Sequence, residues 1–283
     1  SSQLGPSTRS SLSILPAVPM AAGKSTLYTL PMSHYCEAAR WCLESAGVEF
    51  DEKAYLPGIH MMLSPIPSLR KKGTPPEDFS GSDSSTPLWV GPDGSILAFD
   101  SWQCMVKFGP PPAPREKELI DTVIGPTTRT IFYIHSLPAT GEQLFARVWS
   151  STAVPLWQRA LYWTPMRGQV KSRMFGMMVK SEEFVEESRE KLRSAIAHFE
   201  PLLTQAPYAS GELTAAGIAL ASMMAPVVVP PEYAISFYGE PLFRPEDMTP
   251  ACREEIETWR KTPLGAWTLE YFRLHRRPGG AKA

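Results

Sequence analysis

Ser33 and Cys36 are the residues whose types and spacing most directly suggest chemistry in this sequence. They stand three positions apart in the segment Ser-His-Tyr-Cys, which follows a short apolar run, Leu27–Leu30, and begins a run of helical period. A serine hydroxyl can donate a hydrogen bond to an anion, and a cysteine thiolate is a nucleophile. The segment therefore predicts either stabilisation of a bound anion or thiol chemistry.

The elements that would position this pair are a strand, a turn and a helix. Leu27–Leu30 predicts the strand, Pro31 ends it, and the spacing of apolar residues predicts a helix over Tyr35–Ala46. Gly47 is a natural stop, because glycine accepts left-handed backbone angles without steric cost. Such a turn directs the first amides of the helix at whatever lies above the strand end, and these amides favour negative charge.

Three further strands are predicted before residue 100. They are formed by Val48, Phe50 and Lys53–Tyr55; by Thr86–Val90; and, after a Gly-Pro-Asp-Gly turn, by Ser95–Phe99. Between the first two of these strands, the segment Leu56–Ser85 is rich in Pro, Gly and Ser, which predicts irregular structure. Its basic triplet, Arg70-Lys71-Lys72, favours a solvated loop.

Asp100 and Ser101 open a predicted helix that runs to about Phe108. Either side chain can cap the amino end of this helix by accepting a hydrogen bond from a backbone amide. The alternative is a binding role, in which Ser101 and the first free amides hold a carboxylate. Both interpretations stay open on the local sequence, and capping is the simpler one.

The proline-rich segment 109–114 is the clearest boundary, because neither a helix nor a central strand tolerates it. The pattern that follows is almost entirely helical. Helices are predicted over Glu116–Leu137 with a kink at Pro126, Glu142–Val154, Leu156–Trp163, Ser181–Leu203, Ile218–Val229, Pro250–Arg260 and Pro263–His275. We therefore expect two domains, 26–108 and 115–277, joined by the linker 109–114 and flanked by an arm (1–25) and a tail (278–283).

A methionine-rich stretch lies among these helices. Its apolar residues are Tyr162, Trp163, Met166, Met174, Met177 and Met178. Packing in a core explains such residues, and an adaptable hydrophobic pocket is the more specific alternative.

Composition excludes several classes of protein. A net charge of -1 gives no electrostatic basis for binding nucleic acid. The longest apolar run, Ala215–Val229, is interrupted and too short for a membrane span of about 20 residues. The four cysteines and five histidines show no metal-type spacing, so no metal site is predicted. Their pattern also lacks a disulfide framework, which is typical of a reducing intracellular compartment.

Residues 1–25 differ from the rest, because they are rich in Ser and small residues and contain no acid. This composition is typical of a disordered terminal arm, and it is also similar to the tail of an organellar transit peptide. The expected location is therefore the cytoplasm or an organelle, chloroplast or mitochondrion.

Together, the strand–turn–helix, the Thr-Pro-Leu-Trp-Val strand, the Asp100–Trp102 helix start and the proline linker resemble the glutathione transferase superfamily. More narrowly, the chain resembles uncharacterised glutathione transferase-like proteins with a Ser-His-Tyr-Cys-Glu-x-x-Arg-Trp signature. It also shares their Thr214–Ala216 helix start and the Ala225–Tyr233 segment. The resemblance covers about Leu27 to Arg277 and implies an α/β thioredoxin-like domain followed by an all-α helical domain.

The resemblance also implies the roles of site residues and a reaction. Ser33 falls at the position of the family's catalytic Ser or Cys. Pro87 falls at the position of a cis-proline, and the residue before it, here Thr86, is the one expected to bind the glutathione backbone. Asp100 and Ser101 fall on the pair that binds the γ-glutamyl end. The implied reaction joins the glutathione thiolate to a small hydrophobic electrophile. Dimers are usual in the superfamily, so the expected partners include a second copy or a larger assembly.

Two features of the sequence depart from the family pattern. Gly217 stands where an Asp is expected, so the capping box that would begin at Thr214 lacks its reciprocal hydrogen bond. The segment Thr74–Asp83 is an apparent insertion, which would cover or reshape the glutathione site.

Two alternatives to a transferase stay open. One is thiol–disulfide exchange with glutathione through Cys36, although the segment lacks the first cysteine of a Cys-x-x-Cys motif and Cys36 also suits inert packing. The other is a non-catalytic subunit, since a fold does not guarantee activity. His34 would tune the site or, more simply, be a solvated turn residue.

Overall fold

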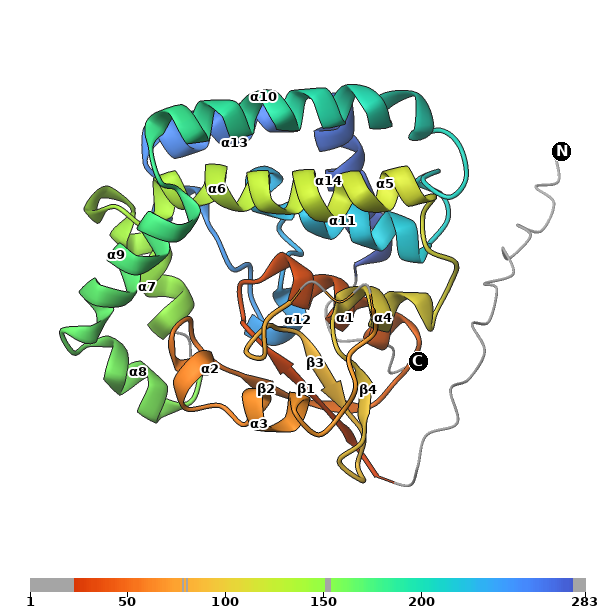
Figure 1. Ribbon diagram of the computed structural model, residues 1–283. Helices are drawn as coiled ribbons and strands as arrows, with labels where there is room; N and C mark the ends of the chain where they lie inside the picture. Colours follow the sequence, from red (N-terminus) through yellow and green to blue (C-terminus); the bar gives the residue numbers. More distant parts are fainter. Residues whose placement is uncertain (1–22, 78, 80, 151–153, 277–283) are drawn as a thin grey trace, which may run out of the picture.

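The computed structural model describes residues 23–77, 79, 81–150 and 154–276. Most of the predicted arm and all of the predicted tail lie outside these residues. Figure 1 shows a small sheet with its own helices at the bottom of the view and a larger helical part above and to the left. No helix in the described part of the chain is long and apolar enough to span a membrane.

A four-stranded sheet in the order β2-β1-β3-β4 forms the first part. β1 (Ser25–Thr29) pairs in parallel with β2 (Phe50–Ala54) and antiparallel with β3 (Leu88–Val90), which pairs antiparallel with β4 (Ile96–Ala98). The two helices α1 (His34–Ser45) and α4 (Ser101–Val106) contact each other. The predicted strands and both helices are therefore confirmed, with ends that differ by a few residues.

The segment predicted to be irregular, Leu56–Ser85, contains two short helices, α2 (Ile59–Met62) and α3 (Ile66–Arg70). Ile66 packs with Tyr28, Leu88 and Val90 in a small second core against the sheet. Prolines and serines obscured these helices, since α3 has Pro65 and Pro67 at its amino end, where proline is compatible with a helix.

The second part is built of helices. They are α5 (Pro114–Glu118), a π-helical turn (Leu119–Ile124), α6 (Gly125–Ser136), α7 (Glu142–Ser150), α8 (Leu156–Tyr162), α9 (Met166–Met178), α10 (Glu182–Phe199), α11 (Ala215–Val228), α12 (Ile235–Tyr238), α13 (Pro250–Arg260) and α14 (Pro263–His275). All residues of α11 are buried, and this helix contacts α1, α6, α13 and α14. The predominantly apolar α11 is thus a fully buried helix, and it includes nearly all of the helix predicted over Ile218–Val229.

The predicted kink at Pro126 takes the form of a π-helical turn. α5, Leu119–Ile124 and α6 follow one another without a gap. Proline removes one backbone donor and crowds the carbonyl four residues earlier, and a wider turn before Pro126 relieves both effects. The helix α9, by contrast, was not predicted as a helix, because its apolar residues do not gather on one face.

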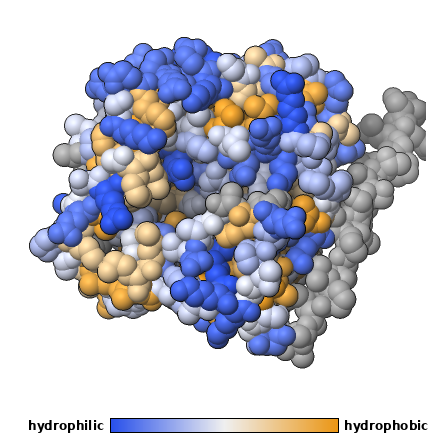
Figure 2. All heavy atoms as spheres, in the orientation of Figure 1, coloured by the Kyte–Doolittle hydropathy of each residue, from blue (hydrophilic) through white to orange (hydrophobic). Residues whose placement is uncertain are grey.

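Hydrophobic side chains are also exposed on one part of the surface. Leu156 and Trp157 of α8, Trp163 just after it, and Met62 of α2 are all more than two-fifths exposed. Figure 2 shows hydrophobic residues gathered at the lower left of this face, over α8. Apolar patches of this kind often mark interaction surfaces. The expected dimer or larger assembly stays a prediction.

Tyr271 supplies the hydrogen bond to the Thr214 amide that a side chain at position 217 would make in a capping box. Thr214 caps α11 by accepting a hydrogen bond from the Gly217 amide at 2.9 Å. The Tyr271 hydroxyl accepts one from the Thr214 amide at 2.9 Å and donates one to the Glu212 carbonyl at 3.0 Å. A Cβ atom at position 217 would lie 2.2 Å from the Tyr271 hydroxyl oxygen. The glycine therefore makes room for a partner that completes the cap from α14.

We predict that Tyr271→Phe lowers the free energy of unfolding by about 1–2 kcal/mol, because it leaves the partly buried Thr214 amide and the Glu212 carbonyl without this partner. Urea denaturation measures this change. Tyr208→Phe is the matched control, since the buried Tyr208 hydroxyl has no hydrogen-bond partner among the described residues. Equal stabilities of the two variants would contradict the assigned role of Tyr271.

Candidate functional site

A cleft of about 600 Å³ lies between the sheet part and the helical part. Ser33, Thr86, Pro87, Asp100 and Ser101 line it together, although they are spread over nearly seventy residues of sequence. The opposite wall comes from α6 and α9 and includes Arg129, Tyr133, Met174, Met177 and Met178. The structure thus brings five of the seven predicted site residues to one cavity.

Ser33 is the N-cap of α1, and its hydroxyl oxygen accepts a hydrogen bond from the Cys36 amide at 3.4 Å. The cap uses only the oxygen, so the hydroxyl proton, which also interacts with the Cys36 thiol, can donate to an anion in the cleft instead. The first amides of a helix have no intrahelical partner, so the amino end of α1 adds partial positive charge beside Ser33. This arrangement suits a bound anion.

The Thr86–Pro87 peptide bond is cis, as the resemblance implied. Thr86 lies just before β3, and its backbone amide and carbonyl have no hydrogen-bond partner among the residues described. An extended peptide laid along the cleft can therefore pair with Thr86 as a further strand would.

Asp100, rather than Ser101, caps α4, since its carboxylate accepts a hydrogen bond from the Gln103 amide at 2.8 Å. Ser101 is the first residue of the helix and is 2% exposed, yet it lines the cleft. The cap and the predicted binding role thus fall on neighbouring residues. The predicted insertion also contributes, because Phe79, Gly81 and Ser82 line the same cleft.

The interpretation of Arg70 as part of a solvated loop was wrong. Its side chain is buried, and one guanidinium nitrogen donates to the carbonyls of Ser85, Pro87 and Phe99 at 2.7, 3.2 and 2.5 Å. Burial lowers the pKa of Arg70 to about 10, so it stays charged at neutral pH. Phe79 lies against the guanidinium with 4.7 Å to its ring centroid. Arg70 therefore connects the turn at Pro87 to the segment just before Asp100.

His34 is also not the solvated residue that its place in a turn suggested. It is 3% exposed and lines a smaller cavity of about 70 Å³ next to the cleft, together with Ser33 and Arg129. Burial, and then the charge of Arg129, lowers the pKa of His34 to about 3, against the effect of a hydrogen bond to the Gly125 backbone. The imidazole is therefore neutral at physiological pH.

Cys36 does not line either cavity and is 0% exposed. Its sulfur accepts a hydrogen bond from the Leu30 amide at 3.3 Å. Burial raises the pKa of the Cys36 thiol, which outweighs the hydrogen bonds from Leu30, Thr86 and Ser33. Reactive cysteines are accessible and have a lowered pKa, so these findings disfavour Cys36 as a nucleophile.

Several residues of the cleft were missed by sequence reasoning. The Tyr35 hydroxyl donates to the Asp121 carbonyl at 3.4 Å, and burial raises the Tyr35 pKa to about 12, so it remains a donor. Arg129 and Tyr133 reach the cleft from α6. The available signal was an arginine among Thr, Ile, Phe and Tyr residues in a helix that otherwise packs inward.

We predict that Arg70→Met lowers the free energy of unfolding by about 2–4 kcal/mol, because three carbonyls lose a charged donor. Hydrogen exchange should rise in segments 84–90 and 98–103, which these carbonyls belong to or border. Lys71→Met is the control, since Lys71 is exposed. If exchange in these two segments is unchanged, Arg70 does not hold them together.

We predict that His34 makes stability fall in mild acid. The unfolded chain binds a proton near pH 6.5 and the folded chain only near pH 3, so stability is full above pH 6.5 and declines below it. Between pH 7.5 and 5, wild type should lose about 2 kcal/mol more than His34→Phe. Urea denaturation at each pH measures the difference. His60, whose pKa burial also lowers, is present in both proteins and cancels. Parallel pH curves would rule out a buried neutral His34.

The fold was compared with known proteins. No family model matches the sequence, and no curated protein does. Among solved structures, the glutathione transferase GSTFuA3 from Phanerochaete chrysosporium is 14% identical, with 90% of this chain and 98% of that chain covered and a TM-score of 0.52. The glutathione S-transferase CsGST63524 of Ceriporiopsis subvermispora, solved with glutathione, is 12% identical, with 91% and 100% covered and a TM-score of 0.49.

The first of these likenesses supports a statement about the fold alone. The four-stranded sheet with its helices and the helical remainder match that architecture over nearly the whole of both chains. The chain therefore has a glutathione transferase-like fold, an α/β thioredoxin-like N-terminal domain followed by an all-α helical domain.

Proposed function

We propose that this protein binds glutathione in the cleft and joins its sulfur to a small hydrophobic electrophile. The observation that carries the proposal is the convergence of Ser33, Thr86, Pro87, Asp100 and Ser101 on one wall of a cleft with a largely apolar opposite wall. These residues offer complementary groups for a tripeptide with an amino group, carboxylates and a thiol.

Each part of glutathione has a suitable partner on this wall. The backbone of Thr86 suits the central peptide, which would pair with it as an extended strand. The Asp100 carboxylate suits the γ-glutamyl amino group, and the Ser101 hydroxyl suits the γ-glutamyl carboxylate. The thiol would then lie toward Ser33 at the amino end of α1.

Ser33 would favour the thiolate because its hydroxyl donates a hydrogen bond to the sulfur. A free thiol has a pKa near about 8.5, and hydrogen-bond donors together with a helix amino end lower it. Glutathione supplies the nucleophilic sulfur, and the chain holds and orients it. The bond that forms joins this sulfur to the electrophilic carbon. With an aryl halide the carbon–halogen bond breaks, the halide ion leaves to solvent, and the thiol proton passes to water.

The wall formed by Met174, Met177 and Met178 would hold the electrophile. Methionine side chains are flexible and polarizable, so they adapt to ligands of different shape. This supports the predicted hydrophobic pocket over simple core packing, since Met177 is 51% exposed. The likeness to a glutathione transferase of Phanerochaete chrysosporium extends to the fold and agrees with the proposal.

Binding of glutathione is the first test. Glutathione at one hundred times its Kd should stabilise the folded protein by about 2.7 kcal/mol, which thermal unfolding detects as a higher Tm. If Tm does not change, the proposal is wrong and a non-catalytic subunit becomes the better interpretation.

We predict that Ser33→Gly lowers kcat with a model aryl halide by about tenfold or more, because the thiolate loses a charged hydrogen bond. Glycine is nearly as good an N-cap as serine, so the helix stays formed. The Kd for glutathione should change by less than about threefold, because the peptide contacts remain.

Ser181→Gly is the matched control for this variant. Ser181 caps α10 by accepting a hydrogen bond from the Phe184 amide at 3.2 Å, and it lines neither cavity. The Ser181→Gly substitution should leave kcat unchanged. A Ser33→Gly protein with wild-type kcat would remove Ser33 from the mechanism.

A further inference from the structure

Arg129 is a cation in the cleft, and the part of the chain that the structure describes holds no counterion for it. It lines both the 600 Å³ cleft and the 70 Å³ cavity next to it. Its Nε is buried, and among residues 23–77, 79, 81–150 and 154–276 this atom has no hydrogen-bond partner and no carboxylate forms an ion pair with the guanidinium. Arginines that reach apolar surroundings normally have a partner, because an unpaired buried charge is costly.

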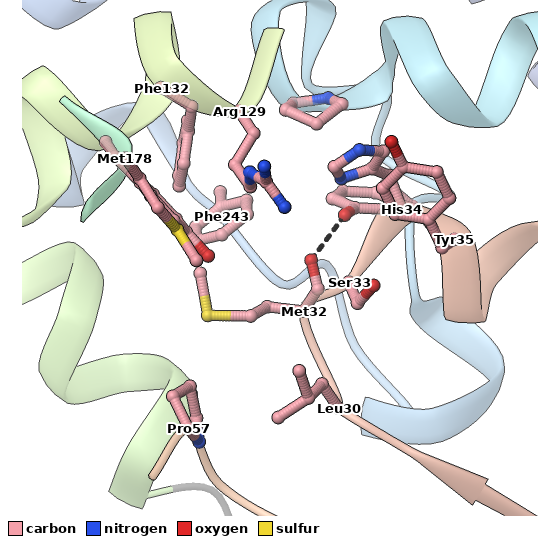
Figure 3. A pocket seen from close by; sticks show the side chains of 13 residues that line it. Leu30, Met32, Ser33, His34, Tyr35, Pro57, Arg129, Phe132, Met178 and Phe243 are labelled. Carbon is pink, nitrogen blue, oxygen red and sulfur yellow. Dashed lines mark hydrogen bonds between the residues drawn. The ribbon is translucent and has the colours of Figure 1, made fainter. Parts of the chain in front are cut away.

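The surroundings of Arg129 are aromatic and apolar. Figure 3 shows its guanidinium extending from α6 into the space between Phe132 and Phe243 on one side and His34 and Ser33 on the other. Neutral His34 adds no second positive charge there. The guanidinium is thus aimed at the place where the body of a bound molecule would meet the sulfur held by Ser33.

The other charges of the cleft do not neutralise Arg129. Asp121 also lines the cleft, two helical turns before Arg129, and the two residues act on the Tyr35 pKa in opposite directions. Asp100 lies on the other side with the start of α4, and Lys117 and the exposed Arg173 add positive charge. A ligand carboxylate is the group that this cavity lacks.

We propose that Arg129 binds the carboxylate of the second substrate, whose apolar body lies against Phe132, Met178 and Phe243. The substrate class is therefore an amphipathic organic acid with an aromatic or alkyl body, rather than a neutral hydrocarbon-like electrophile. A planar guanidinium pairs with a carboxylate through two parallel hydrogen bonds, which also orient the ligand. The assignment as substrate rests on the proposed function, whereas the binding itself requires no turnover.

The test compares 4-phenylbutyrate with its neutral amide, 4-phenylbutyramide, by calorimetry on the full chain without glutathione. Wild type should bind the acid about tenfold or more tightly than the amide. Arg129→Met should lose this preference while the Kd for the amide changes by less than about twofold. Arg129→Lys should keep part of it, because it retains the charge and loses the paired geometry.

Arg173→Met is the matched control, because it removes the same charge from an exposed position of the same cleft. It should keep the preference for the acid. Equal affinity of wild type for the two probes would overturn the proposal, and so would loss of the preference in the Arg173 variant alone. Arg129→Gln repeats the measurement if the Met variant does not fold.

Glutathione binding separates this inference from the proposed function. Arg129→Met should leave the Kd for glutathione within about threefold, because none of the proposed tripeptide contacts involves Arg129. A large loss would instead place Arg129 in the glutathione site and overturn the inference. Failure of wild type to bind glutathione would sink the proposed reaction, while the acid preference would still report on Arg129.

Discussion

A buried network of charges holds α1 in place, and the site depends on it. Glu37 and Arg40 are 0% exposed, and Arg40 donates to Glu37 at 2.5 Å and to Glu52 of β2 at 2.6 and 2.8 Å. Arg276, after the end of α14, donates to Glu37 at 2.7 Å and pairs with Glu44. One helix is thereby connected to the sheet and to the carboxyl end of the described chain.

The stability of this network depends on a balance between the cost of burying each charge and its attraction to its partners. Burial alone would raise the pKa of Glu37, but Arg276 and Arg40 outweigh it and hold the pKa below its usual value. Removing one member of such a set leaves a charge without its partner, which typically costs about 3–5 kcal/mol. Because every carboxylate here has a guanidinium, the set specifies one orientation of α1. That orientation determines where Ser33, at the amino end of α1, faces the turn at Thr86.

The local parts of the fold could be predicted because their signals are local. Both last helices begin at the predicted prolines, Pro250 and Pro263, since a first-turn proline acts within one turn, and Thr249 and Thr262 are their N-caps in the structure. Arg70 could not be placed, because a basic triplet looks solvated and its three carbonyl partners lie 15–29 residues away. Burial of His34 was hidden for the same reason, since the charge that acts on it is on α6.

The position of Arg129 at a cavity wall distinguishes it from most other buried polar groups that have no partner among the described residues. Trp41 and Tyr208 also have buried polar atoms without a partner among the described residues, but neither residue lines the cleft or the smaller cavity next to it. Arg129 and His34 have such atoms at the wall of the smaller cavity, and His60, whose pKa burial also lowers, has one at the wall of the cleft. Burial keeps His34 neutral, whereas an arginine keeps its charge in proteins. Arg40 and Arg276 have carboxylate partners in the protein, whereas Arg129 has none among the described residues and lies where a ligand can supply the anion.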